Sequence, residues 1–226
     1  MKGPIEYIKE AWSIYFKKEN FLFFVKIMAV LTIVSTSLSY LIYYLYPVIN
    51  WQNFEFDNTG MAVGFLALAL LSTIFYFYSQ STTYSAILNI NLSEKEIFKL
   101  GYRKMWRFLL ISLIVGLIIG FGALLLIIPA LIFGIWYSFS IFLVLDKELR
   151  VKEALKQSKA MVKGKFWVIL GRNLVFGLFG FLISFIFGLI PYAGGILVSF
   201  LAPLFVLPSY LLYRDLSSGL DNLRAV

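Results

Sequence analysis

The stretch FLLISLIVGLIIGFGALLLIIPALIFGIWYSFSIFLVL, residues 108–145, decides the fold of this chain because it contains no charged residue. A helix that crosses the hydrocarbon core of a membrane needs about 20 mostly apolar residues, so this stretch is long enough for two crossings. Pro129 lies inside it and lacks the amide hydrogen that would continue a preceding helix, whereas proline is well tolerated in the first turn of a new helix. We therefore expect spans at 108–128 and 129–145, joined by a tight hairpin, and not one very long kinked helix.

The composition of the whole chain also indicates an integral membrane protein. Of its 226 residues, 61% are hydrophobic and only 14% are charged. Soluble globular domains are about 45–50% apolar and about 25% charged, and a soluble fold of this composition would expose a very large apolar surface. Cys and His are both absent, which removes thiolate and imidazole metal ligands and the side chain best suited to proton transfer near neutral pH. The sequence therefore predicts no metal, no cofactor and no enzymatic activity.

Four further stretches satisfy the same length requirement. They are 21–45, 61–78, 167–190 and 193–213. The second continues through the uncharged polar run SQSTTYS and is expected to form one long helix to about residue 89. The last two are joined by IPYAGG, in which Pro191 has the same role as Pro129. The predicted fold class is an all-α integral membrane protein with six transmembrane helices.

The distribution of Lys and Arg predicts how these spans are oriented. The 18 basic residues outside the apolar stretches lie in the N-terminal segment, in the second and fourth connections and in the C-terminal tail. The three alternate connections, PVINWQNFEFDNTG, IIPA and IPYAGG, contain no Lys or Arg. Because an excess of Lys and Arg marks the cytoplasmic side, we expect a protein of the cytoplasmic membrane with both termini in the cytoplasm.

The fourth connection lies in VLDKELRVKEALKQSKAMVKGKFWVIL, residues 144–170, and has an amphipathic pattern. At 100° per residue, one stripe of a helix holds Lys152, Lys156, Lys159 and Lys163, and another holds Val151, Ala154, Leu155, Ser158 and Val162. Such a helix is typical of the membrane interface, where its lysines contact anionic headgroups. Nucleic-acid binding is not expected, because the chain has no folded soluble domain that could present a groove-reading element.

A basic amphipathic segment precedes each pair of spans. In the first, Ile5, Ile8, Trp12, Tyr15 and Phe16 share one face, and the second follows the pattern less regularly. The chain then reads as one membrane domain, 1–226, with three cytoplasmic-side amphipathic interfacial helices. Its expected parts are an amphipathic helix at 1–20, spans at 21–90, a second amphipathic helix at 91–107, spans at 108–145, a third amphipathic helix at 146–166, spans at 167–213 and a cytoplasmic tail at 214–226.

Lys26 and Arg172 are the two ionisable residues inside the predicted spans. They either face the bundle and hold an anionic headgroup or a substrate phosphate, or extend to the interface, since at ~1.5 Å per residue they lie only about 8–9 Å deep. The polar run at 79–85 has two interpretations as well. It either lines a cavity or, as we expect, is the end of a helix that emerges among headgroups.

A pattern of residues from the fourth span onward is shared with a known group of proteins. It comprises Ile128-Pro129, Tyr137-Ser138 and Asp146, then Glu153, Ala154, Ser158 and Met161, then Lys163-Gly164, and the ending LLYRDL at 211–216. In these features the chain resembles a broad group of bacterial and archaeal multi-pass membrane proteins. One branch has no known function, and another is the membrane domain fused to some glycerophosphoryl diester phosphodiesterases. The chain departs from this pattern at Ala130, where Gly is common.

The resemblance implies a membrane domain without an established reaction of its own. In the fused members the phosphodiesterase activity belongs to a separate barrel domain that uses His and carboxylates, and this chain has no His. The resemblance therefore implies no catalytic residue in this chain.

The sequence favours a non-enzymatic inner-membrane protein. Its basic amphipathic helices would contact anionic lipid or a membrane protein partner, in envelope or lipid homeostasis. The alternative is a transporter, or a transporter subunit, for an anionic or lipid-like solute, which the polar run, Lys26 and Arg172 support. The sequence predicts no oligomeric state.

Overall fold

The computed structural model describes residues 1–46, 59–191 and 193–224, and all the regular secondary structure within these ranges is helical. The helices in chain order are α1 (Pro4–Phe16), α2 (Lys18–Leu45), α3 (Thr59–Leu88), α4 (Glu94–Leu125), α5 (Ile127–Trp136), α6 (Ser140–Asp146), α7 (Val151–Val162), α8 (Phe166–Gly188), α9 (Gly194–Phe200) and α10 (Ala202–Arg224). The predicted fold class is confirmed.

Six segments of the described chain are long and apolar enough to cross a membrane: α2, α3, α4, α5 with α6, α8, and α9 with α10. In each segment, at most 33% of the residues in its most apolar 18-residue stretch are buried inside the protein. Side chains such as Leu124 and Phe181 point outward from these helices. Lipid must cover this surface, since an aqueous environment would leave an apolar area far larger than soluble proteins expose. The chain is a multi-pass membrane protein.

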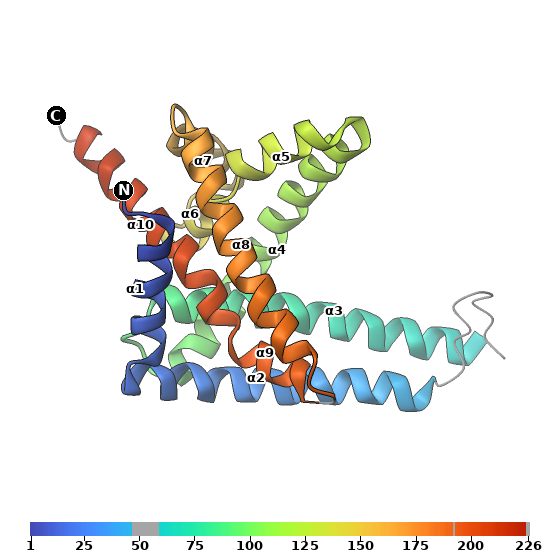
Figure 1. The fold of residues 1–226 in the computed structure, drawn as a ribbon. Coiled ribbons are helices and arrows are strands. Elements are labelled where there is room, and N and C mark those ends of the chain that lie inside the picture. Colours follow the sequence, from blue (N-terminus) through green and yellow to red (C-terminus); the bar gives the residue numbers. More distant parts are fainter. Residues whose placement is uncertain (47–58, 192, 225–226) are drawn as a thin grey trace.

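The expected hairpin between the third and fourth spans is present, and it turns at Leu126. Helix α5 begins at Ile127, which places Pro129 in its first turn, where a missing amide hydrogen costs nothing. The two helices approach closely at Gly122, where an added Cβ would lie 3.0 Å from the Cα of Ala130. A glycine is therefore present at this close contact. Figure 1 shows α4 and α5 running back along each other from this turn.

The second amphipathic segment differs from the expectation. Residues 91–107 do not form a separate interfacial helix, because α4 runs without a break from Glu94 into the span. A capping box starts it, in which Ser93 accepts from the amide of Glu96 while the Glu96 carboxylate accepts from the amide of Ser93. No proline follows to end the helix before the apolar part begins. The expectation of one long helix at 61–89 is confirmed by α3.

Helix α1 forms as predicted, but only part of its predicted apolar face is buried. Tyr7, Ala11 and Tyr15 are buried, whereas Ile5 and Trp12 from the predicted apolar face are exposed. The reason is that α1 packs against the protein through its tyrosines, whose hydroxyl groups reach partners at the far end of the chain: Tyr15 donates to the carbonyl of Phe200 over 2.7 Å. The exposed apolar side chains are then free to contact lipid.

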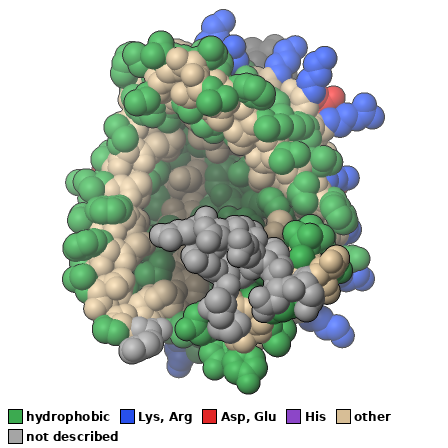
Figure 2. Space-filling model, turned by 90° about the vertical axis from the view of Figure 1, so that its right-hand side faces the viewer, with side chains coloured by type: hydrophobic (Ala, Val, Ile, Leu, Met, Phe, Trp, Pro, Cys, Tyr) green, Lys and Arg blue, Asp and Glu red, His purple; other side chains and the backbone are tan. Residues whose placement is uncertain are grey.

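The helices lie close together on the left of Figure 1 and spread apart toward the right. In Figure 1, α1, α7 and the C-terminal part of α10 lie on the left, and the α2–α3 and α4–α5 pairs extend to the right. Figure 2, viewed from that right-hand side, shows a hollow at the centre with hydrophobic side chains around it, while Lys and Arg appear at the outline. The side of the molecule that Figure 2 shows is therefore mainly hydrophobic.

Candidate functional site

The basic surface of α7 consists of Lys152, Lys156, Lys159 and Lys163, all of which are exposed. On the opposite stripe Ala154, Ser158, Met161 and Val162 are buried, so the predicted amphipathic character is confirmed. The apolar stripe does not lie on lipid, however, because α5 and α6 cover it. The exposed side of α7 therefore carries the lysine stripe.

Ser158 explains why α7 packs there. The fourth span is interrupted between α5 and α6, and this break leaves backbone groups without helical partners. The Ser158 hydroxyl donates to the carbonyl of Trp136 over 2.7 Å and accepts from the amide of Phe139 at 3.2 Å. Because unpaired backbone groups are costly in an apolar environment, this side chain stabilises the break. Ser158 has a structural role in this arrangement.

Gly164 and Asp146 also have structural roles. Gly164 adopts a φ of +77°, a left-handed conformation that favours glycine and that turns the chain from α7 into α8. Asp146 accepts a 2.8 Å hydrogen bond from the hydroxyl of Tyr213, which joins the end of α6 to α10. Lys159 lies over the ring of Trp136, 3.9 Å from its centroid, which fixes this lysine against α5.

Lys26 and Arg172 both contact residues that are distant in the sequence. The ammonium of Lys26 lies 2.9 Å from the carboxylate of Glu94, at the first residue of α4. Arg172 donates from Nε and from a terminal nitrogen to the carbonyl of Lys2, at 3.0 and 2.6 Å. Neither residue lines a cavity described below. Contact with an anionic lipid or solute remains a prediction for both.

The polar run of α3 lies inside the protein. Ser81, Thr82, Thr83 and Ser85 are buried, so the expectation that this run emerges among headgroups is wrong. Part of it lines a cavity of about 300 Å³ between α2 and α3. The hydroxyl-bearing and amide side chains of this cavity are Thr32, Ser35, Ser39, Ser72, Tyr76, Ser79, Gln80, Thr83 and Ser199. It could receive a polar molecule that hydrogen-bonds to neutral donors and acceptors.

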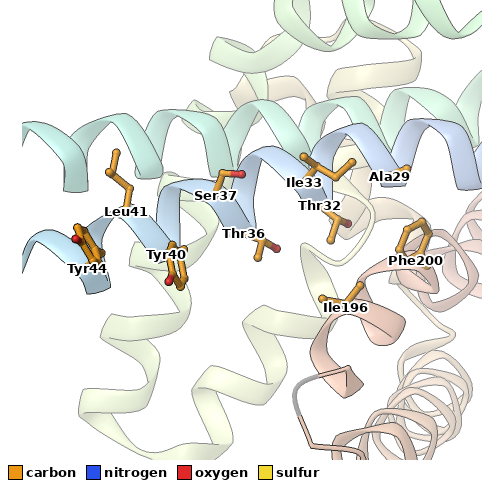
Figure 3. Close-up of a pocket in the computed structure, with 10 residues that line it drawn as sticks. All are labelled: Ala29, Thr32, Ile33, Thr36, Ser37, Tyr40, Leu41, Tyr44, Ile196 and Phe200. Atoms are coloured by element: carbon orange, nitrogen blue, oxygen red, sulfur yellow. The ribbon is translucent and has the colours of Figure 1, made fainter. Parts of the chain in front are cut away.

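A second cavity, of about 570 Å³, runs along the other side of α2 toward α9. Figure 3 shows Thr32, Thr36 and Tyr40 projecting from α2 on the side where Ile196 and Phe200 of α9 lie. It holds no charged side chain among the residues that line it. Its walls suit a hydrocarbon chain better than an ionic ligand.

A third cavity, the basic pocket, has a different character. Arg103, Lys104 and Arg107 of α4 and Glu148 of the α6–α7 connection line its volume of about 340 Å³. One guanidinium nitrogen of Arg107 lies 3.0 Å from the Glu148 carboxylate, and the ammonium of Lys104 lies 3.8 Å from it. In the sequence these cations indicate only orientation, because nothing in the local pattern brings Glu148 to α4.

Glu148 is ionised in this setting. The hydrogen bond from Arg107 and the positive charges of Arg107 and Lys104 hold the pKa of Glu148 below its ordinary value. Within the described residues, no group of three or more His, Cys, Asp or Glu comes together that could hold a metal ion.

Comparison with known proteins gives no relative from which a function could be inferred. No protein-family model, curated protein or solved structure matches this chain. The fold therefore defines the class, a multi-pass membrane protein, and the resemblance described above remains a prediction.

Proposed function

We propose that this chain is a non-enzymatic protein of the cytoplasmic membrane that binds anionic lipid headgroups through the basic surface of α7 and the outer face of α1. The observation that carries the proposal is the exposed lysine stripe of α7, which leads directly into α8. Trp167, in the first turn of α8, is 79% exposed, and tryptophan favours the level of the headgroups. The lysines next to it are then close to lipid phosphates.

The outer face of α1 supports the same placement. Its exposed aromatic rings, Trp12 and Phe16, lie with centroids 4.5 Å apart, and Phe16 stacks on Phe21 of α2 at 5.7 Å. Lys17 and Lys18 follow at the junction of the two helices. Aromatic rings beside lysines are typical of segments that anchor in the interface.

Contacts between the two ends of the chain support a shared side for the termini. Arg214 of α10 forms an ion pair with Glu10 of α1 at 3.1 Å. With the distribution of basic residues, this favours a cytoplasmic location for both ends. A protein that holds anionic lipid at this face would act in lipid or envelope homeostasis, alone or with a membrane protein partner.

Lipid retention tests this proposal. We would purify the chain from vesicles of equal phosphatidylglycerol and phosphatidylcholine and measure the bound lipids by native mass spectrometry. Changing Lys152, Lys156, Lys159 and Lys163 together to Gln should reduce the preference for phosphatidylglycerol, since each lysine near the surface contributes roughly 1 kcal/mol. Changing the same four residues to Arg keeps the charge and should preserve the preference. An unchanged preference in the Gln variant would refute the proposal.

A second candidate function, transport of a small solute, is favoured by one observation in the cavity between α2 and α3. The hydroxyl of Ser72 is buried there without a hydrogen-bond partner in the described part of the chain. A buried polar group without a partner is rare, and a polar solute would supply one. Uptake of a labelled solute into vesicles, abolished by Gln80→Leu, would support transport. The headgroup-binding proposal predicts no uptake to lose.

A further inference from the structure

The basic pocket holds more positive charge than its own carboxylate neutralises. Three cations and one carboxylate line it. Lys104 is buried, where an uncompensated charge is costly, and the exposed Arg103 and Arg107 line the same space beside it. The excess in this pocket points to an anion that the chain itself does not supply.

The positions of the four side chains fit this interpretation. Lys104 is only 7% exposed, and its ammonium donates to the carbonyl of Leu145 as well as facing Glu148. The two oxygens of Glu148 face different cations, one toward Lys104 and the other toward Arg107. Arg103 lines the same space and has no ion-pair or hydrogen-bond partner among the residues that the structure describes. The guanidinium of Arg103 is thus available in addition to the two cations that Glu148 already contacts.

The backbone of Glu148 is held in an uncommon conformation. Its φ is +51°, in the left-handed region that side chains with a Cβ rarely adopt. Such a conformation persists when the surroundings impose it, and it is enriched at ligand-binding sites. In this chain it places a carboxylate where an anionic ligand would be held by Lys104 and Arg107.

The nearest other acid does not fill this role. Asp146 acts on Lys104 through its charge, but it does not line the pocket and it accepts the hydroxyl of Tyr213. The pocket also lies beside exposed aromatic rings of α4, Tyr102 and Trp106. Aromatic residues of this kind mark the headgroup level, where phosphate groups are abundant.

We propose that Arg103, Lys104 and Arg107 form a binding site for a phosphate group, which is carried by an anionic lipid headgroup or by a soluble phosphate. Arginine forms paired hydrogen bonds with phosphate oxygens, and lysine adds a compact charge. The pocket volume of about 340 Å³ is ample for a phosphate, given a share of about 30 Å³ per water molecule in the liquid. Glu148 acts as an internal competitor that occupies the cations when no ligand is bound. If the phosphate belongs to a lipid headgroup, the site depends on the membrane placement proposed above. If the phosphate is soluble, the site does not depend on it.

The test uses the full chain in two arms. In the first, binding of inorganic phosphate is measured by isothermal titration in a neutral detergent. In the second, retention of phosphatidylglycerol is measured by native mass spectrometry after extraction from vesicles of equal phosphatidylglycerol and phosphatidylcholine. Arg103→Gln with Arg107→Gln should weaken binding by at least about tenfold, the effect expected when charged hydrogen bonds are lost. The matched control, Lys95→Gln with Lys99→Gln, removes two exposed lysines of the same helix that do not line the pocket and should leave binding unchanged.

Glu148→Gln gives a second readout with the opposite sign. Because it removes the competing charge, it should tighten binding by about fivefold, a change that a misfolded variant would not produce. Pocket-dependent retention of phosphatidylglycerol without phosphate binding assigns the site to lipid, and binding of inorganic phosphate alone assigns it to a soluble ligand.

Unchanged binding of both probes in the double Arg variant, or no tightening in Glu148→Gln, would overturn the phosphate site. The headgroup-binding proposal fails separately, when the four α7 lysines can be changed to Gln without effect.

Discussion

The hydroxyl of Tyr7 donates a 2.7 Å hydrogen bond to the carboxylate of Asp215, so that the first and last helices of the chain are joined directly. Tyr7 is buried, and its ring also packs edge-on against Phe176 of α8. The first helix is therefore an integral part of the bundle and not a detachable surface segment.

Tyr7→Phe should lower the free energy of unfolding by about 1–3 kcal/mol, because it removes a hydrogen bond to a charged group and leaves Asp215 without that donor. A denaturant titration in detergent micelles would measure the change. Tyr102→Phe, at an exposed position on α4, is the control and should have almost no effect. Equal stabilities for wild type and Tyr7→Phe would show that this contact does not hold α1 in place.

The same pair predicts a pH dependence. Burial, and next the hydrogen bond to Asp215, raise the pKa of Tyr7 to about 12, above its ordinary value of 10.0. A raised pKa means that the stabilisation is complete below pH ~10 and is lost as the pH rises toward ~12. The stability difference between wild type and Tyr7→Phe should therefore be constant up to pH ~10 and then shrink. A difference that grows above pH ~10 would have the wrong sign for this account.

Ser158→Ala should destabilise the protein by about 1–3 kcal/mol, because the carbonyl of Trp136 and the amide of Phe139 would lose their partner at the break in the fourth span. Ala160→Ser changes an exposed position of the same helix and serves as the control. Thermal unfolding of the purified variants would measure both. If Ser158→Ala is as stable as Ala160→Ser, the break is satisfied in another way.

Gly101→Ala tests the close contact between α3 and α4. A Cβ at this position would lie 2.8 Å from the Cα of Thr82, and backbone cannot yield as a flexible side chain can. We expect a loss of about 1–3 kcal/mol in the free energy of unfolding. Gly116→Ala, on the same helix, meets nothing within 4 Å and should be neutral or slightly stabilising. A neutral Gly101→Ala would mean that the two helices can separate at no cost.

The positions of the spans were predictable because each is decided by local composition. The hairpin at Pro129 and the long α3 follow from the residues within each stretch. The interruption between α5 and α6 was not predicted, because no proline or charged residue marks it and the stabilising Ser158 comes from α7. The local sequence pattern does not predict a hydrogen-bond partner that comes from another helix.

The candidate sites show the same limit more strongly. The lysine stripe of α7 follows from helical periodicity alone, but the burial of the polar run of α3 depends on how α3 packs in the bundle. Likewise, the fold brings Lys104 and Glu148 together. Lys104 donates to the carbonyl of Leu145, 41 positions further along the chain, and Glu148 follows Leu145. Charge counting identifies orientation, whereas a binding pocket requires the tertiary structure.

The central claim is that six spans place all the basic connections on one side of the membrane. Because the chain has no Cys, single cysteines can be introduced at Glu55, in the first connection without Lys or Arg, and at Lys156, on α7. A membrane-impermeant thiol reagent applied to intact cells should label position 55 and should label position 156 only after the membrane is opened. Labelling of both positions from the same compartment would contradict the account.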